Sequence, residues 1–150
     1  MYTEILLPSD GSDAAAVATE HALDLARRYD ARLHVLYVVD QSAVGGMMSE
    51  STLVASALET EGTEVVEAVA QLAGDHGVDV VTSVVTGHPS RAILDYAKEH
   101  DVDLVVMGTH GRSGIDRYLL GSVTERVVRR ADVPVLAVRE GEQSTESSSD

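Results

Sequence analysis

The 150-residue chain contains no cysteine, phenylalanine or tryptophan, and its single lysine is Lys98. Without cysteine, neither disulfide bonds nor thiolate metal sites are possible. The core must be built mainly from alanine, valine and leucine, and 150 residues suffice for one domain with a substantial buried core. The longest apolar runs have the length of a strand and are too short to span a membrane, so we expect no membrane partner.

Positive charge is also scarce. The chain has 11 basic and 25 acidic residues, and its net charge is -14. Such a surface repels the phosphates of nucleic acids, so we expect no binding to DNA or RNA. The cluster of Arg126, Arg129 and Arg130 is interpreted as complementing a helix dipole. High acidity with one lysine resembles halophilic proteins, whose self-repulsion concentrated salt screens. An ordinary acidic cytosolic protein is the alternative.

The two ends of the chain carry little structural signal. Met1 to Pro8 is too short for a signal peptide and lacks its basic region, which predicts a soluble, cytoplasmic protein. Glu140 to Asp150 is rich in serine and glutamate and has no apolar anchor. We therefore expect a domain at residues 1–139 and an acidic, serine-rich disordered tail at residues 140–150.

Strand-length apolar runs alternate along the chain with longer stretches of helical periodicity. This order predicts an α/β fold, a single doubly wound open sheet of five parallel strands with helices on both faces. Residues 41–49, which include two glycines, predict a mobile loop. The predicted strands are 5–7, 33–39, 78–85, 103–107 and 133–138, and the predicted helices are 13–29, 51–76, 89–100 and 123–130.

The clearest functional signal is a glycine-rich run after the fourth predicted strand. Gly108 and Gly111 follow the apolar residues of that strand, and nine residues later Gly121 and Ser122 open the next helix. A strand that runs through glycines into a helix start presents free backbone N–H groups at the positive end of the helix dipole, where phosphate is stabilised. The run therefore predicts a phosphate or nucleotide site.

Two further features support a phosphate site. His110 and Arg112 stand among the glycines and can donate hydrogen bonds to phosphate oxygens. The turn at residues 8–11 follows the first strand, and in such sheets ligands bind at the carboxyl ends of the strands. Two alternatives stay open. Ser122 and Glu125 can form a capping box that satisfies the helix's own N–H groups, and the first glycine can be a plain turn.

The common phosphate motifs are absent. No Gly-x-x-x-x-Gly-Lys-Ser/Thr sequence occurs, and Pro-Ser-Asp-Gly-Ser follows the first strand where a nicotinamide dinucleotide fold has Gly-x-Gly-x-x-Gly. The glycine spacing instead resembles the ATP-binding motif of the universal stress protein family. The turn at residues 8–12, the Gly87-x-Pro89 turn and the strand at 133–138 resemble other segments of that family, so the resemblance covers nearly the whole chain.

The resemblance implies a Rossmann-like strand order of 3-2-1-4-5 and membership of the branch that binds ATP, because that branch keeps these glycines. Mg²⁺ or Mn²⁺ can bridge the phosphates, since such an ion keeps several waters and needs few protein ligands. Near the adenine and ribose the resemblance places Pro8, Ser9, Asp10, the backbone of Val38, Met107 and Gly108. Around the phosphates it places Gly111, Arg112, Gly121, Ser122, Val123 and Thr124.

The resemblance further implies a stress-response regulator that forms a homodimer through its last strand. If the strand from Val133 to Val138 is outermost, it is an apolar edge that a two-fold partner would cover, although Pro134 lacks an N–H group there. Two other functions stay open. One is slow ATP hydrolysis or phosphoryl transfer, for which no residue stands out to orient a nucleophile. The other is a non-nucleotide interaction dimer whose glycines only shape turns.

The titratable side chains do not predict a metal centre. The six histidines form no i, i+4 pair beside a carboxylate. Asp10, Asp13 and Asp40 can gather near strand ends, but we expect Asp13 in the first turn of a helix, where an acid is stabilising. We interpret every histidine except His110 as a surface or helix-end residue; these are His21, His34, His76, His88 and His100.

Overall fold

A computed structural model of the chain describes residues 1–44, 48–110 and 120–140, which form one five-stranded parallel sheet in the order β3-β2-β1-β4-β5. The predicted α/β fold and the strand order implied by the family resemblance are both confirmed. The strands are β1 Glu4–Pro8, β2 Arg32–Asp40, β3 Val80–Gly87, β4 Leu104–Gly108 and β5 Val135–Val138. The helices are α1 Asp13–Tyr29, the short 3-10 helix η1 Gln41–Val44, α2 Met48–Asp75, α3 Pro89–Glu99 and α4 Ser122–Arg130.

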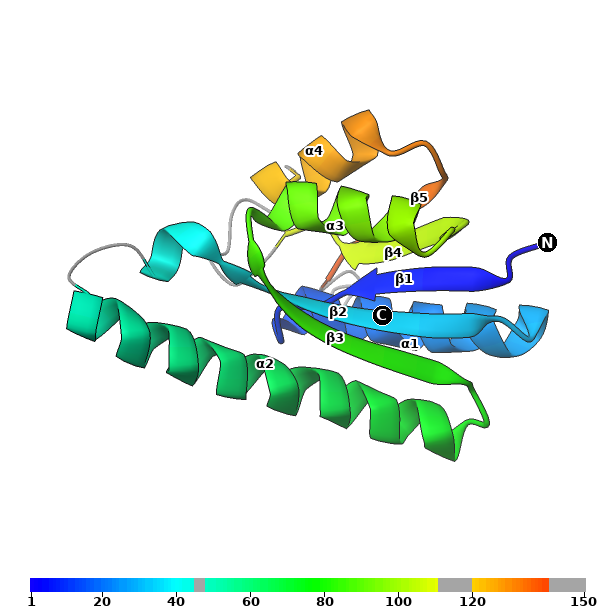
Figure 1. Cartoon of the computed structure of the whole chain (residues 1–150). Coiled ribbons are helices and arrows are strands. Elements are labelled where there is room, and N and C mark those ends of the chain that lie inside the picture. Colours follow the sequence, from blue (N-terminus) through cyan, green and yellow to red (C-terminus); the bar gives the residue numbers. More distant parts are fainter. Residues whose placement is uncertain (45–47, 111–119, 141–150) are drawn as a thin grey trace, which may run out of the picture.

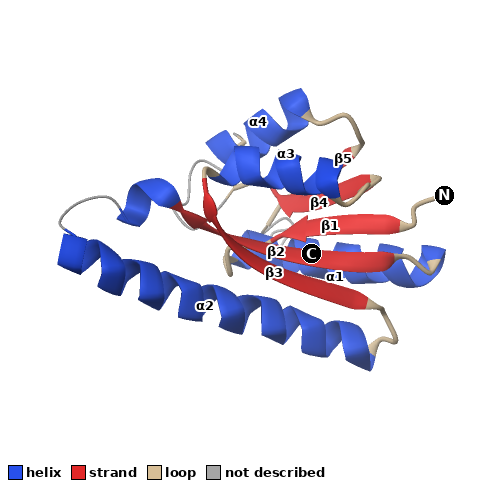
Figure 2. Cartoon of the chain, viewed as in Figure 1, coloured by secondary structure: helices blue, strands red, loops and turns tan. Residues whose placement is uncertain are grey.

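The helices cover both faces of the sheet. α1 and α2 pack on one face, and α3 and α4 pack on the other (Figure 1). All strands run in the same direction within the central layer (Figure 2). Because side chains alternate along a strand, Ile5 and Leu7 enter the core beneath α1 and α2, whereas Leu6 enters the core beneath α3 and α4. Burial on both faces explains why the central strands are continuously apolar.

Local signals in the sequence account for several element ends. Ser12 caps α1, as its side-chain oxygen accepts a hydrogen bond from the Ala15 N–H group at 3.2 Å. Asp13 lies in the first turn of α1, as expected. Pro89 is the first residue of α3, where its missing N–H group is not needed.

Several predicted boundaries were wrong by two residues or more. β3 runs from Val80 to Gly87, two residues later than predicted at both ends. β5 begins at Val135, two residues later than predicted, because Pro134 has no N–H group to donate; its carbonyl still accepts a hydrogen bond from the Val105 N–H group at 3.0 Å. The segment predicted as a mobile loop is partly helical, since η1 occupies Gln41–Val44 and α2 begins at Met48. Residues 45–47 of that segment lie outside the described residues.

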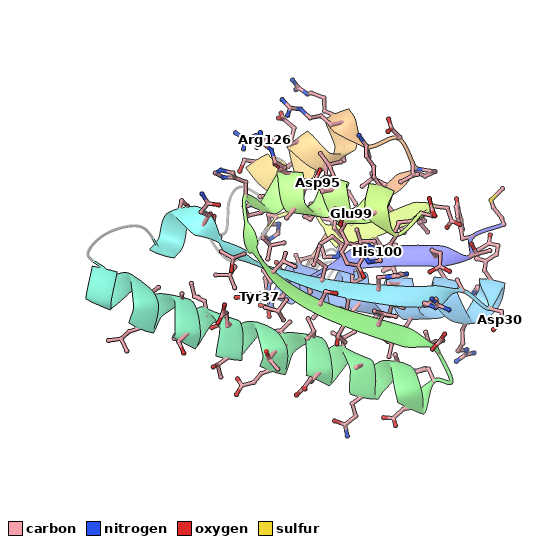
Figure 3. The ribbon with its side chains drawn as sticks, in the orientation of Figure 1. Asp30, Tyr37, Asp95, Glu99, His100 and Arg126 are labelled. Atoms are coloured by element: carbon pink, nitrogen blue, oxygen red, sulfur yellow. The ribbon has the colours of Figure 1, made fainter. Side chains whose placement is uncertain are left out.

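His34 is buried in β2, which corrects its interpretation as a surface or helix-end histidine. It is 3% exposed; its Nε2 atom lies 2.6 Å from Glu4 Oε1 and its Nδ1 atom lies 2.8 Å from the Tyr96 hydroxyl. The pKa of the Tyr96 hydroxyl is raised, mainly because the group is buried. A hydrogen bond with Ser83 lowers this pKa in part, and the negative charge of Glu4 raises it further. With partners for both ring nitrogens, a histidine can occupy a core position. His100 does lie at the end of α3 (Figure 3).

Gly62 allows α2 to lie against Tyr37 of β2. A Cβ atom at position 62 would lie 2.5 Å from the Tyr37 Cδ1 atom, closer than two carbon atoms pack. The ring is held in place, because Tyr37 is 5% exposed and its hydroxyl donates a hydrogen bond to Glu61 Oε2 at 2.8 Å. Tyr37 lies between β2 and α2 (Figure 3).

We predict that Gly62→Ala lowers the free energy of unfolding by about 1–3 kcal/mol through overpacking, although alanine favours a helix over glycine by about 1 kcal/mol. Gly74→Ala is the matched control in the same helix, since a Cβ atom there meets nothing within 4 Å among the described residues. It should stabilise the protein by up to about 1 kcal/mol. Urea unfolding measures both variants, and effects of the same sign would contradict the packing argument.

Candidate functional site

A cavity of about 560 Å³ opens at the carboxyl ends of β1, β2 and β4. Segments far apart in the sequence meet there, at the edge where open α/β sheets bind ligands. Of the residues predicted to contact a nucleotide, Gly111 and Arg112 lie outside the described residues. All the others line this cavity, namely Pro8, Ser9, Asp10, Val38, Met107, Gly108, His110, Gly121, Ser122, Val123 and Thr124.

Several lining residues were not identified from the sequence. The sequence indicated Asp40 only as an acid near a strand end, and it lines the cavity together with Asp10. Leu58 of α2 and Ile93 of α3 contribute apolar wall to the cavity. The available signal was position, because α3 starts at the edge of the sheet where the cavity lies and Ile93 is in its first turns.

The first turn of α4 lines the cavity without a side-chain cap. Gly121 is the N-cap residue, and no described side chain accepts a hydrogen bond from the start of the helix. The capping box of Ser122 and Glu125, kept open as an alternative, is therefore wrong: the helix begins at Ser122, so this side chain lies within the first turn and not before it. Within the described residues, the first-turn N–H groups of α4 therefore have no side-chain cap.

Three hydrogen bonds join the glycine run to the sheet and to α4. The Gly121 N–H group donates to the Thr109 carbonyl at 2.7 Å, and the Thr109 N–H group donates to the Val138 carbonyl at 2.9 Å. The buried Thr124 hydroxyl donates to the Gly108 carbonyl at 2.8 Å. The start of α4 is thereby fixed relative to the ends of β4 and β5.

Gly108 and Gly121 both stand where a side chain would meet neighbouring backbone. A Cβ atom on Gly108 would lie 2.9 Å from Ala14 Cβ and 3.0 Å from the Ala14 carbonyl carbon, so Gly108 permits the close approach of α1 to β4. It is more than the plain turn considered from the sequence. A Cβ atom on Gly121 would lie 3.2 Å from His110 Cα, a tight contact.

The described lining carries few charged groups. Asp10 Oδ1 accepts a hydrogen bond from the Ser12 N–H group at 3.0 Å. Asp40 Oδ1 accepts two hydrogen bonds from Ser42, from its N–H group at 3.0 Å and from its hydroxyl at 2.8 Å. His110 is the one basic side chain among the described lining residues. In this part of the cavity, the available hydrogen-bond donors are backbone N–H groups and one imidazole.

A larger groove, of about 810 Å³, runs between α1 and α2. Its walls are mainly helical side chains, apolar ones such as Leu23 and Val65 with acidic ones such as Glu20 and Glu64. It is not bounded by several strand ends, and the helix start at its end is capped by Ser12. The smaller cavity is the better candidate for a ligand site.

Comparison with known proteins agrees with this geometry. The model of the universal stress protein family matches residues 1–139. The chain belongs to the universal stress protein family. Universal stress protein MJ0531 of Methanocaldococcus jannaschii is 40% identical over 141 residues, which cover 93% of this chain and 83% of the relative.

Solved structures of universal stress proteins share the fold. The structure of MJ0577 from Methanocaldococcus jannaschii has a TM-score of 0.87 at 30% identity and covers 95% of this chain and 99% of its own. A universal stress protein solved in complex with cAMP has a TM-score of 0.67 at 28% identity, covering 93% of this chain and 98% of its own. In the described part of this chain, no helix is long and apolar enough to cross a membrane.

We predict that Gly108→Ala lowers the free energy of unfolding by about 2–3 kcal/mol, because its methyl group overlaps Ala14. Gly87→Ala is the matched control at the last residue of β3. A Cβ atom there has its nearest described neighbour, Ala92 Cβ, at 3.9 Å, so this change should stay within about 1 kcal/mol. Thermal unfolding compares the two variants, and equal losses would show that Gly108 is not specially constrained.

Proposed function

We propose that the protein binds an adenine nucleotide, ATP, in the cavity at the carboxyl ends of β1, β2 and β4. The observation that carries this proposal is the uncapped start of α4, which lines a cavity built from three strand ends. A volume of about 560 Å³ lies within the range of small-molecule sites, roughly 300–1,000 Å³. The cAMP complex of a relative at 28% identity supports an adenine nucleotide as the ligand.

In this proposal the two ends of the cavity hold different parts of the nucleotide. Pro8, Ser9, Asp10 and the backbone of Val38 lie by the adenine and ribose, and Met107 and Gly108 by the ribose. The phosphates lie at the start of α4, where N–H groups and the helix dipole favour negative charge. The residues assigned to the phosphates are His110, Gly111, Arg112, Gly121, Ser122, Val123 and Thr124.

Mg²⁺ or Mn²⁺ enters this proposal only together with the nucleotide. Among the described residues, no three histidine, aspartate or glutamate side chains are grouped to hold a metal ion. Phosphate oxygens and water can supply most ligands of Mg²⁺, so the protein needs to add few. ATP occupancy would then act as the signal of a stress-response regulator.

We further propose that the protein is a homodimer through β5. This strand is at the edge of the sheet, and an uncovered edge offers unpaired backbone groups to another chain. Leu136 on β5 is 38% exposed and Val128 on the neighbouring α4 is 45% exposed, so the edge also carries apolar surface. Pairing two identical edges about a two-fold axis would bury both features.

We predict that Ser122→Asp abolishes measurable ATP binding while leaving the fold as stable or slightly more stable. The new carboxylate repels phosphate, but an acid in the first turn of α4 interacts favourably with the helix dipole, by about 0.3–1 kcal/mol. Gln71→Glu on the exposed face of α2 adds the same charge away from the cavity and should bind like wild type. Calorimetry with Mg-ATP at high salt, with thermal unfolding alongside, measures both properties.

Two outcomes of that experiment would count against the proposal. Wild-type protein that binds neither ATP, ADP nor AMP would refute nucleotide binding. If the Ser122→Asp variant binds ATP as tightly as wild type, the phosphates do not bind at the start of α4.

We predict that Leu136→Asp converts the dimer into a monomer, because it places a charge in the apolar edge. Leu72→Asp is the matched control, since Leu72 is also exposed, at 46%, but lies on α2. Light scattering coupled to size-exclusion chromatography gives the mass of each variant. A monomeric wild type, or a Leu136→Asp dimer, would contradict assembly through β5.

A further inference from the structure

His110 is hydrogen-bonded to Glu140, two residues beyond the end of β5. The His110 Nε2 atom lies 3.0 Å from Glu140 Oε1, and the two side chains are 11% and 33% exposed. The His110 Nδ1 atom lies 3.3 Å from the Thr109 hydroxyl oxygen. An ionised carboxylate only accepts hydrogen bonds, so Nε2 carries the proton in this pair, and the Thr109 hydroxyl can either donate to Nδ1 or accept from it. Both ring nitrogens are therefore engaged within the protein.

The position of His110 brings this pair next to the start of α4. A Cβ atom on Gly121 would lie 3.6 Å from His110 Cβ, and the His110 side chain lines the cavity. An anion bound at the start of α4 would be a second negatively charged acceptor for the Nε2–H group. A hydrogen bond to an ionised acceptor is about twice as strong as one between neutral groups. The Glu140 carboxylate and the bound anion would therefore compete for the Nε2–H group.

We propose that Glu140 is a positioning residue that competes with the phosphates of a bound nucleotide for the Nε2–H group of His110. On binding, Nε2–H changes its acceptor from Glu140 to a phosphate oxygen, and no covalent bond changes. The inference rests on the proposed nucleotide site and adds a determinant of phosphate number to it. Since Coulomb repulsion between Glu140 and the ligand grows with charge, Glu140 disfavours ATP more than AMP and leaves adenosine unaffected.

The same exchange connects the site to the edge of the sheet. Glu140 follows β5 by two residues, and Val138, the last residue of that strand, accepts the hydrogen bond of Thr109 next to His110. Freeing the Glu140 carboxylate therefore changes the polar contacts at the end of the edge strand. The pair of His110 and Glu140 would then connect ligand binding in the cavity to the proposed dimer edge.

The test compares the full chain with Glu140→Ala by calorimetry with ATP, AMP and adenosine at one salt concentration and one pH. We expect Glu140→Ala to bind ATP about fivefold more tightly, AMP with a smaller gain and adenosine unchanged. Glu140→Gln keeps an acceptor without the charge and should fall between. Glu99→Ala, at the last residue of α3, removes one exposed negative charge far along the chain and should leave all three affinities unchanged.

Nitrogen-15 NMR of the His110 ring provides a readout that a purely structural role would not move. The Nε2 signal should shift when Glu140 is replaced by alanine, and in wild type when ATP is added, but not when adenosine is added. Weaker or unchanged ATP binding by Glu140→Ala, or an equal gain for adenosine, overturns this inference and leaves nucleotide binding intact. If wild-type protein binds none of the three ligands, both the role of Glu140 and the proposed nucleotide site are refuted.

Discussion

The close approach at Gly108 is the constraint on which the rest of the site depends. Because Gly108 has no side chain, Ala14 at the start of α1 lies directly against the end of β4. The carbonyl of the same glycine accepts the hydrogen bond of Thr124 in the first turn of α4. One residue thus joins a helix on each face of the sheet to one strand end. The starts of the two helices that border the cavity are therefore both held against the end of β4.

The doubly wound topology places two helix starts beside the cavity, but they are not equivalent. The chain leaves β1 for α1 on one face and β4 for α4 on the other, so a crevice forms where the connections from these neighbouring strands part to opposite faces. α1 is capped by Ser12, which uses one of its free N–H groups internally. α4 begins at Ser122, and its N-cap residue, Gly121, has no side chain that could accept a hydrogen bond. The proposed anion site is therefore at the start of α4 and not at the start of α1.

Features that depend on local periodicity could be predicted from the sequence. Features that depend on contacts between residues of different helices and strands could not. Apolar runs and helix signals predicted the alternation of strands and helices. The glycine spacing indicated residues that, where they are described, line one cavity. The burial of His34 depends on Glu4 and Tyr96, which are 30 and 62 residues away in sequence. The contact of Gly62 with Tyr37 likewise joins two elements. Such pairings need the register of the packed fold, which a one-dimensional pattern does not contain.

The proposed anion site, made of backbone N–H groups, suits a chain with a net charge of -14. The long-range field of such a protein repels a phosphate, and that repulsion is screened over about 10 Å at 0.1 M salt and over about 3 Å at 1 M. Hydrogen bonds from a helix start act within one turn and survive that screening better than distant charges do. Salt therefore removes more of the opposing repulsion than of the local attraction. The proposed anion site has a single described histidine and no described lysine, so most of its donors would be backbone N–H groups that the fold positions.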